Sequence, residues 1–362
     1  MKIQQYWYRQ NLHLFLLPLV PLSWVYGLIV KLRRFLYRSG IKKTNRLPIP
    51  TIVVGNITLG GTGKTPFVMW LVDYLKSQGK TPGIALRGVG GRKHYKPIEV
   101  AFRSNPYEVG DEAVLLAQNT FCPVVTCIDR AAAVNKLIEL DCDIAICDDG
   151  LQHYGLDRDI EIAIVDASRY FGNHRLLPAG PLREPINRLK EVDIIVVNQP
   201  ANYLPDTHNR INNLTTYPMR LEMETFVSIY SHSQQLDLSA FSGQTVHAIA
   251  GIGNPQRFFA MLNSLGIDVI PHVFPDHHQY QLTDLDFKDS FPIIMTEKDA
   301  IKCRLLSVQH NLNKKHLWYL RVNLEVGDGL KQVIQHKISN IVMHRLTGLR
   351  PRMMLDTTEE ET

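Results

Sequence analysis

The stretch of this sequence best suited to chemistry is Thr58–Thr65, which reads T-L-G-G-T-G-K-T. An apolar, β-branched run at Thr51–Val54 precedes it, and a helical pattern follows it to about Gln78. In such a strand–loop–helix unit, backbone amides bind phosphate oxygens, the lysine reaches the β- and γ-phosphates of ATP, and the next hydroxyl ligates Mg²⁺. Thr58 stands where the strict pattern has glycine, so a glycine-rich turn with a surface lysine is the alternative. The predicted phosphate-binding residues are Thr58, Leu59, Gly60, Gly61, Thr62, Gly63, Lys64 and Thr65.

Two adjacent aspartates, Asp148 and Asp149, follow another apolar run at Asp143–Cys147. A carboxylate at a strand end beside a phosphate loop can hold the Mg²⁺ that bridges the β- and γ-phosphates. Taken alone, such a pair is more often a helix cap or a solvated turn. Because the phosphate loop lies upstream, we expect at least one of the two, together with Thr65, to ligate the metal.

Asp111, His277 and His278 are the candidates for proton transfer. Asp111 opens a helical pattern, so it is either an N-cap or a base that accepts the proton of a hydroxyl group. The histidines lie in a turn rich in proline and aspartate. Neighbouring side chains of an extended chain point to opposite sides, so we expect at most one histidine to be functional. Exposed turn histidines are the alternative.

Four arginines follow predicted strands or loops that face the same crevice. Their planar guanidinium groups suit phosphate recognition, although a single arginine is more often a surface charge. They are Arg87, Arg92, Arg130 and Arg183.

The elements that must position these residues alternate between strand and helix. This alternation predicts an α/β fold with a mostly parallel, helix-covered sheet of the phosphate-loop NTPase type. A smaller α/β unit and an N-terminal membrane-associated helix are expected beside it. Strands are expected at Thr51–Val54, Thr81–Leu86, Val124–Ile128, Asp143–Cys147, Ile160–Val165 and Asp193–Val197. The expected divisions are an apolar segment (1–36), a nucleotide-binding domain (37–218), a linker strand (219–232), a smaller α/β domain (233–325), a C-terminal helix that packs back (326–348) and an acidic tail (349–362).

The N-terminal segment is unusually apolar. Between Leu12 and Val30 only His13 and Ser23 are polar. The length permits a membrane span, but Pro18 and Pro21 would break a helix in the middle, which favours a bent segment lying in the interface. Burial on the protein core is the alternative. We therefore expect a peripheral or monotopic protein on the cytoplasmic side of a membrane, where basic residues meet anionic lipids. These basic residues are Lys31, Arg33, Arg34, Arg38, Lys42, Lys43 and Arg46.

The composition excludes some classes of protein. The chain has 362 residues, of which 45% are hydrophobic and 21% charged, so more than one domain is expected. A net charge of +5 is modest and gives no reason to expect binding to a nucleic acid, so we expect no nucleic-acid partner. The five cysteines form no C-x-x-C pair, which argues against a disulfide framework or a zinc site.

Several further motifs accompany the loop. The loop motif itself is G-N-x-T-x-G-G-T-G-K-T-P at 55–66, and it is followed by R-G at 87–88, G-D-E-A at 110–113, D-D-G-L-Q-H at 148–153 and L-P-A-G-P-L-R-E-P at 177–185. The second unit adds F-P-D-H-H-Q-Y at 274–280 and M-T-E-K-D-A at 295–300. In this combination the chain resembles the tetraacyldisaccharide 4'-kinase family of lipid A synthesis. One departure is Val89, where the family commonly has tyrosine.

The resemblance implies ATP- and Mg²⁺-dependent phosphorylation of the 4'-hydroxyl of a tetraacylated glucosamine disaccharide 1-phosphate at the cytoplasmic face of the inner membrane. It implies that Lys64 and Thr65 serve the phosphates and metal, with Asp148 and Asp149 in the metal site or its charge network. It makes Asp111 the catalytic base and His277 the histidine that orients it. The implied charged lining of the site is Glu112, Arg130, Arg183 and Glu184.

Two other functions fit part of the pattern. A phosphate-loop regulatory ATPase or GTPase at a membrane would explain the loop, the aspartate pair and the apolar segment. A nucleotide-binding scaffold without catalysis would need only the loop. Neither gives a reason for an aspartate and a histidine contributed by different domains.

Overall fold

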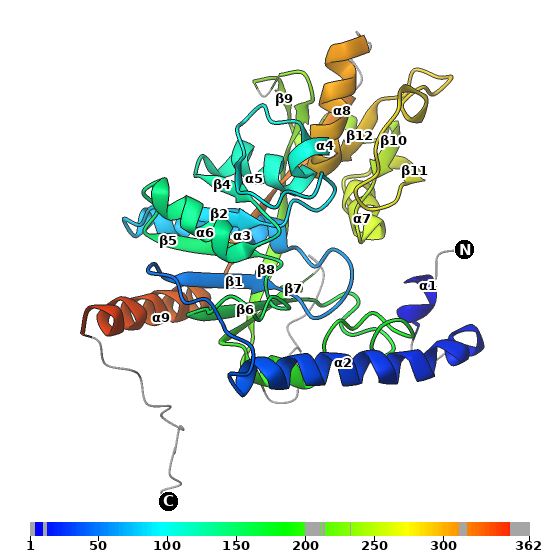
Figure 1. The fold of residues 1–362 in the computed structure, drawn as a ribbon. Coiled ribbons are helices and arrows are strands. Elements are labelled where there is room, and N and C mark those ends of the chain that lie inside the picture. Colours follow the sequence, from blue (N-terminus) through cyan, green and yellow to red (C-terminus); the bar gives the residue numbers. More distant parts are fainter. Residues whose placement is uncertain are drawn as a thin grey trace, which may run out of the picture.

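The computed structural model describes residues 4–9, 13–199, 211, 214–231, 233–310 and 317–347. The strands within these residues form one continuous thirteen-stranded sheet (Figure 1). The acidic tail predicted at 349–362 lies outside the described residues.

The strands are β1 (Thr51–Gly55), β2 (Pro82–Leu86), β3 (Ile98–Glu99), β4 (Val124–Thr126), β5 (Ile144–Asp148), β6 (Ile160–Asp166), β7 (Ile194–Gln199), β8 (Tyr217–Ser228), β9 (Gln235–Leu236), β10 (Thr245–Ala250), β11 (Asp268–Val273), β12 (Ile293–Thr296) and β13 (Leu317–Val326). The α-helices are α1 (Gln4–Trp7), α2 (Val20–Arg38), α3 (Lys64–Ser77), α4 (Pro106–Val109), α5 (Asp111–Thr120), α6 (Arg130–Glu139), α7 (Pro255–Ser264), α8 (Glu297–His310) and α9 (Asp328–Thr347). Short 3₁₀ helices include η1 (Leu14–Leu19), η2 (Ile186–Glu191), η4 (Leu238–Phe241) and η5 (Leu282–Asp284).

The sheet order is β11-β10-β12-β13-β8-β7-β6-β1-β5-β2-β4-β3, with β9 paired to β8 outside this path. The strands from β7 to β4 are parallel to one another, and so are those from β11 to β13. β8 joins the two halves, because it is parallel to β7 and antiparallel to β13. The α/β fold with a mostly parallel sheet is therefore confirmed. The domain boundaries proposed around the linker strand stay predictions, since the sheet runs through it.

Burial explains why these sequences form the strands. All five residues of β1 are buried, as are all five of β2 and of β5, which is the pattern of parallel strands covered on both faces. One face carries the apolar sides of α3 and α5, and Leu330, Ile334 and Ile338 of α9 join the same cluster. The other face is covered by α6 and η2. The parallel half of the sheet is therefore a rigid support for the loops at its edge.

One local expectation differs from the structure. Pro18 lies within η1, and Pro21 lies in the first turn of α2, where proline is tolerated. The expected break in the middle of the helix is therefore wrong.

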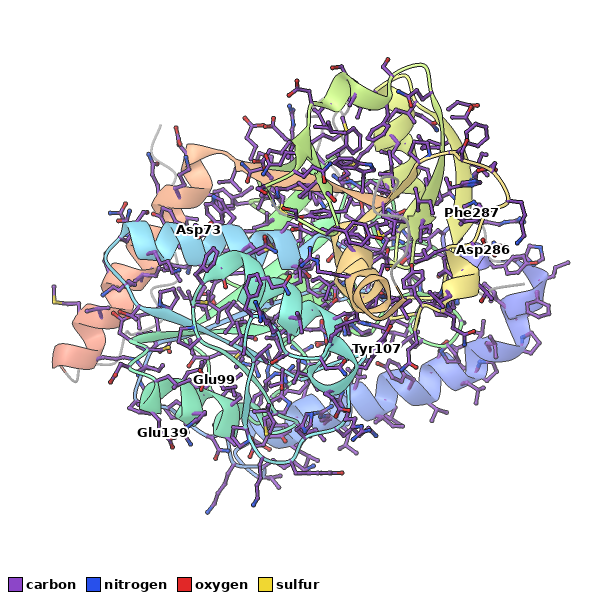
Figure 2. All side chains as sticks on the ribbon, turned by 90° about the horizontal axis from the view of Figure 1, so that it is seen from above. Asp73, Glu99, Tyr107, Glu139, Asp286 and Phe287 are labelled. Atoms are coloured by element: carbon purple, nitrogen blue, oxygen red, sulfur yellow. The ribbon has the colours of Figure 1, made fainter. Side chains whose placement is uncertain are left out.

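Helix α2 extends along one side of the molecule, with many of its side chains projecting away from the body (Figure 2). Only Ser23 and Gly27 of this helix are buried, whereas Trp24 and Leu28 are each 67% exposed. Burial of this apolar segment on the protein core, one of the alternatives above, is therefore wrong. The stretch Leu14–Arg38 is the one part of the described chain that is long and apolar enough to cross a membrane, judged by length and composition.

Candidate active site

The predicted phosphate loop leaves the sheet at an edge where several parallel strands end. β1 ends at Gly55, and α3 begins at Lys64 after the loop. β5 is a parallel neighbour of β1, and Val54 pairs with Asp148 in the register. The sheet therefore places the aspartate pair beside the loop, at the edge where open parallel sheets bind ligands.

The backbone of this loop can accept an anion. Among the described residues, the amides of residues 60–63 donate to no protein acceptor. The N-terminus of α3, which carries partial positive charge, follows immediately. Free amides next to a helix N-terminus are the arrangement that binds phosphate oxygens.

Lys64 is held in place by Asp149 and by Asn56, a residue that the sequence analysis missed. Its Nζ lies 3.5 Å from Asp149 Oδ1 and donates to Asn56 Oδ1 over 3.3 Å. Arg183 donates to both oxygens of Asp149, over 2.9 and 2.7 Å, and also to Asn56 Oδ1. Burial alone would raise the pKa of Asp149, but Lys64 and Arg183 hold it well below its usual range. Asp149 is therefore a fixed negative charge between two cations.

Asp148 lies in a different electrostatic setting from its neighbour. Burial raises its pKa, and the carboxylates of Glu112 and Asp149 raise it further against the opposing effect of Lys64. This carboxyl would gain most from a nearby divalent cation, which favours its charged form. Thr65 supplies a hydroxyl oxygen at the start of α3. Oxygen donors of this kind, few in number, fit Mg²⁺, which takes most of its ligands from water and phosphate. No cage of three or more histidine, cysteine or acidic side chains was found among the described residues.

Asp111 and His277 meet across the two halves of the protein. Asp111 is the first residue of α5, with Gly110 as the N-cap, so it is not itself the N-cap. Its Oδ1 lies 2.8 Å from Nδ1 of His277. His277 belongs to the turn that follows β11. Burial opposes ionisation of Asp111, but the His277 hydrogen bond and Lys298 hold its pKa well below its usual range. Burial lowers the pKa of His277, but the hydrogen bond to Asp111 together with the negative charges of Asp111 and Asp276 shifts this pKa upward.

The two adjacent histidines have separate environments. His278 Nε2 lies 3.0 Å from Asp284 Oδ2, and its ring stacks on Phe274 with the centroids 4.7 Å apart. His277 alone of the pair contacts Asp111. Gly90 lies against this contact: a Cβ there would be 2.8 Å from His277 Nδ1 and 3.3 Å from Asp111 Oδ1. The glycine-rich loop after β2 thus makes room for the aspartate–histidine pair.

Two lysines of α8 complete this cluster, and the sequence analysis assigned them no role. Lys298 Nζ lies 2.9 Å from Glu112 Oε1 and 3.0 Å from Asp276 Oδ1. The almost fully buried Lys302 lies 3.4 Å from Asp111 Oδ2. Lys298 is the lysine of the M-T-E-K-D-A motif, and Lys302 follows the motif. Their spacing of four residues places them on one face of the helix. That spacing was the available signal, and α5 and α8 do pack together (Figure 1).

A cavity of about 520 Å³ lies between α2 and the carboxyl ends of the parallel strands. Tyr26, Val30 and Arg33 of α2 form one wall, and Asp148 and Asp149 lie opposite in the lining. The predicted charged lining residues Glu112, Arg130, Arg183 and Glu184 all border it. The cavity therefore extends from the apolar N-terminal helix to the aspartate pair. The loop Thr58–Thr65, Asp111 and His277 are not among the residues that border it.

The buried charges of the cavity wall are fixed by further contacts. Arg130 donates to the carbonyl oxygens of Cys127 and Asp148, over 3.0 and 3.3 Å. Glu184 Oε2 accepts from the Tyr154 hydroxyl over 2.6 Å and lies 3.4 Å from Arg188 Nε. The wall thus presents guanidinium and carboxylate groups whose positions are set before a ligand arrives.

The remaining arginine expectations have different outcomes. Arg87 borders the cavity. Val89, which stands where the family commonly has tyrosine, borders it as well. Arg92 is exposed and pairs with Glu108, 3.2 Å away. It is not among the residues that border the cavity, so its place in the crevice stays a prediction.

Comparisons with known proteins agree on one family. The family model described as Tetraacyldisaccharide-1-P 4'-kinase matches residues 15–339. The Tetraacyldisaccharide 4'-kinase of Coxiella burnetii (strain RSA 331 / Henzerling II) is 42% identical over 95% of this chain and 98% of its own length. That of Alkalilimnicola ehrlichii is 43% identical over 91% of this chain and 93% of its own. Among solved structures, LpxK from Aquifex aeolicus in complex with ATP superposes with a TM-score of 0.71 at 29% identity, covering 90% of this chain and 99% of the other.

Proposed function

The chain belongs to the family of tetraacyldisaccharide-1-phosphate 4'-kinases, and on that basis we propose how its residues carry out the reaction. It is a kinase of lipid A biosynthesis that uses ATP to phosphorylate the 4'-hydroxyl of tetraacyldisaccharide 1-phosphate. Membership of this family replaces the two alternatives considered from the sequence, which were a regulatory ATPase or GTPase at a membrane and a nucleotide-binding scaffold without catalysis.

The loop Thr58–Thr65 binds the phosphates of ATP. Its amides donate to the phosphate oxygens, and Lys64, already oriented by Asp149 and Asn56, reaches the β- and γ-phosphates. Mg²⁺ would be held by Thr65 and Asp148, and when bound it supplies positive charge that offsets the charge of the phosphate oxygens. Asp149 keeps Lys64 and Arg183 in position.

Asp111 accepts the proton of the acceptor's 4'-hydroxyl. The His277 ring and the Glu112 amide both contact Oδ1, whereas Oδ2 faces the Lys302 ammonium group at 3.4 Å. Oδ2 is buried and has no hydrogen-bond partner among the described residues. A carboxylate of low pKa is a weak base, so it takes the proton late, after the forming O–P bond has made the hydroxyl acidic.

The lipid acceptor approaches along α2. Its acyl chains stay in the bilayer beside the exposed apolar face of this helix, and its sugar head enters the cavity behind Tyr26 and Arg33. The protein lies at the cytoplasmic face of the inner membrane as a peripheral or monotopic enzyme, because ATP is available on that side. The exposed basic residues beyond α2 then face anionic lipids.

The observation that carries these roles is the buried Asp111–His277 contact. It lies beside Glu112, which borders the cavity that α2 bounds. The test is transfer of labelled γ-phosphate from ATP to tetraacyldisaccharide 1-phosphate by the full-length protein in mixed micelles. We expect label on the lipid for the wild type and none for Lys64→Met. The proposal would be contradicted if the wild type consumed ATP at the same rate with and without the lipid.

A further inference from the structure

Four consecutive carbonyl groups of the phosphate loop each accept a hydrogen bond from a side chain. The donors are Tyr8 Oη to Leu59 O (2.9 Å), Asn56 Nδ2 to Gly60 O (3.3 Å), Arg169 Nη2 to Gly61 O (2.7 Å) and Asn198 Nδ2 to Thr62 O (3.0 Å). Only Asn56 belongs to the loop motif. The other three residues lie far away in the sequence.

These bonds fix the direction of the loop's amides. In a planar trans peptide, the carbonyl and the following N–H point in opposite directions. A carbonyl held outward by a side chain therefore turns the next amide away from that side chain. The four bonds orient the amides of residues 60–63, the same amides that donate to no protein acceptor among the described residues. Without such a bond, a peptide can rotate and present its oxygen to the phosphate, which is repulsive.

Tyr8 is the unexpected member of this set, because it belongs to the N-terminal segment before α2 and precedes the residues that the family model matches. The segment is anchored to the protein body at Trp7, the residue that precedes Tyr8. Trp7 Nε1 donates to Pro178 O over 3.1 Å, and the Asn173 amide donates to Trp7 O over 2.7 Å. Tyr6 and Trp7 are buried against Leu16 in a small apolar cluster, which Leu59 also joins.

Arg169 connects Tyr8 with both halves of the protein. Its guanidinium carbon lies 4.8 Å from the centroid of the Tyr8 ring, a cation–π distance. The same guanidinium donates to Gly61 O and, over 2.8 Å, to Gly253 O. Gly253 approaches so closely that a Cβ there would lie 2.1 Å from Gly61 N. The apex of the loop is therefore clamped between the N-terminal segment and the turn that precedes α7.

We propose that Tyr8 is a positioning residue for ATP binding: its hydroxyl holds the Leu59 carbonyl outward and so directs the Gly60 amide toward the phosphates. This inference rests on the proposed use of the loop for ATP. It makes the N-terminal segment, whose neighbouring helix faces the membrane, a structural part of the donor site. Loss of that segment then weakens ATP binding as well as membrane contact.

The purely structural explanation is that Tyr8 only fastens the N-terminal segment. Tyr74 provides a matched control, because its hydroxyl also donates to one backbone carbonyl, Lys331 O, over 2.9 Å. That bond joins α3 to α9 and lies away from the loop. Tyr8→Phe and Tyr74→Phe remove the same group and the same kind of bond, so a general loss of stability affects both alike.

The test uses full-length wild type, Tyr8→Phe and Tyr74→Phe in mixed micelles. For each protein we measure Tm, kcat, the KM for ATP and for the lipid, and the Kd of a non-hydrolysable ATP analogue without lipid. We expect Tyr8→Phe to raise the KM for ATP and the Kd by about threefold to tenfold, the factor for one lost hydrogen bond. The KM for the lipid stays unchanged, and Tyr74→Phe leaves both nucleotide constants at the wild-type value.

Two results would overturn the inference. One is an unchanged Kd and KM for ATP in Tyr8→Phe, and the other is an equal rise in both variants. The proposed function fails separately, since it is lost only when the wild type transfers no phosphate to the lipid. Analogue binding by the wild type remains measurable in that case, so the two failures are distinguishable.

Discussion

His277 Nδ1 lies 2.8 Å from Asp111 Oδ1, although 166 positions separate the two residues in the chain. One residue opens α5 in the nucleotide-binding half, and the other follows β11 near the opposite end of the sheet. The pair therefore exists only while the two halves hold this relative position. Changes that separate the pair should lower turnover without weakening ATP binding, because the phosphate loop lies elsewhere on the sheet edge.

Gly90→Ala tests this dependence. Gly90 has φ +85°, and a Cβ there would lie 2.8 Å from His277 Nδ1, so the added methyl group must displace the ring. We expect kcat to fall by about tenfold to 100-fold, as small misplacements at a reacting centre do. The KM for ATP should stay near its wild-type value, as measured by steady-state kinetics.

The control for Gly90→Ala is Gly79→Ala. Gly79 has a similar φ of +72° but no atom within 4 Å of the added Cβ. Both variants carry the conformational cost of alanine at positive φ, roughly 1 kcal/mol. A fall in kcat for Gly79→Ala as large as that for Gly90→Ala would show that backbone strain, and not the aspartate–histidine contact, is responsible.

The raised pKa of His277 predicts a definite pH dependence of stability. The Asp111 hydrogen bond raises this pKa in the folded protein, against burial, while the unfolded value is about 6.5. The stabilisation is therefore complete below pH 6.5 and is lost as the pH rises through the folded pKa. We expect the difference in unfolding free energy between wild type and His277→Gln to shrink as the pH rises over this range.

Urea unfolding at several pH values measures that difference, and an NMR titration of the His277 ring gives the pKa directly. A difference that grows with pH, or a ring that titrates below 6.5, would contradict the assigned direction.

Arg183→Lys should impair the use of ATP. Lysine cannot reproduce the two parallel hydrogen bonds of 2.9 and 2.7 Å that Arg183 donates to Asp149. The Asp149 carboxylate is then no longer held by a second cation, and its attraction displaces Lys64. We expect kcat/KM for ATP to fall by about tenfold to 100-fold, the value of a lost charge-assisted bidentate contact. Arg92→Lys is the control, because Arg92 is exposed and pairs only with Glu108 among its salt-bridge partners in the described chain. Equal losses in both variants would refute the assignment.

The exposed face of α2 should determine membrane binding. Trp24 and Leu28, each 67% exposed and four residues apart, lie on one side of the helix. The double variant Trp24→Glu/Leu28→Glu should lower partitioning into anionic vesicles by about 100-fold or more, because each buried apolar side chain contributes roughly 1.5–3 kcal/mol. Phe121→Glu, at a position 79% exposed outside α2, should have little effect. Vesicle co-sedimentation measures both, and a similar loss in the two proteins would argue against α2 as the contact.

The sequence was sufficient for the parts of the fold and site that depend on local pattern. Apolar runs marked β1, β2 and β5, and the glycine-rich motif marked the loop between β1 and α3. The alternation of strands and helices then placed Asp148 near Lys64, because parallel strands end at a common edge. The role of each residue beyond this placement remains a prediction.

Other features depend on long-range packing and had no local signal. The continuity of the sheet through β8 follows from its pairing with β13, the last strand of the described chain, which lies far from β8 in the sequence. Lys302 reaches Asp111 only because α8 packs on α5. Tyr8 reaches the loop only because Trp7 is anchored on the segment around Pro178. Arg92 pairs with Glu108, a contact that its place after a strand does not predict.

The measurement that tests the central claim most directly is phosphoryl transfer by Asp111→Asn. This change keeps the shape of the side chain and removes the charge that accepts the 4'-hydroxyl proton. In single-turnover transfer of labelled γ-phosphate to tetraacyldisaccharide 1-phosphate, we expect the rate to fall by about 100-fold or more, the usual contribution of a general base, while ATP-analogue binding is retained. Transfer by this variant at close to the wild-type rate would contradict the assignment of Asp111 as the base.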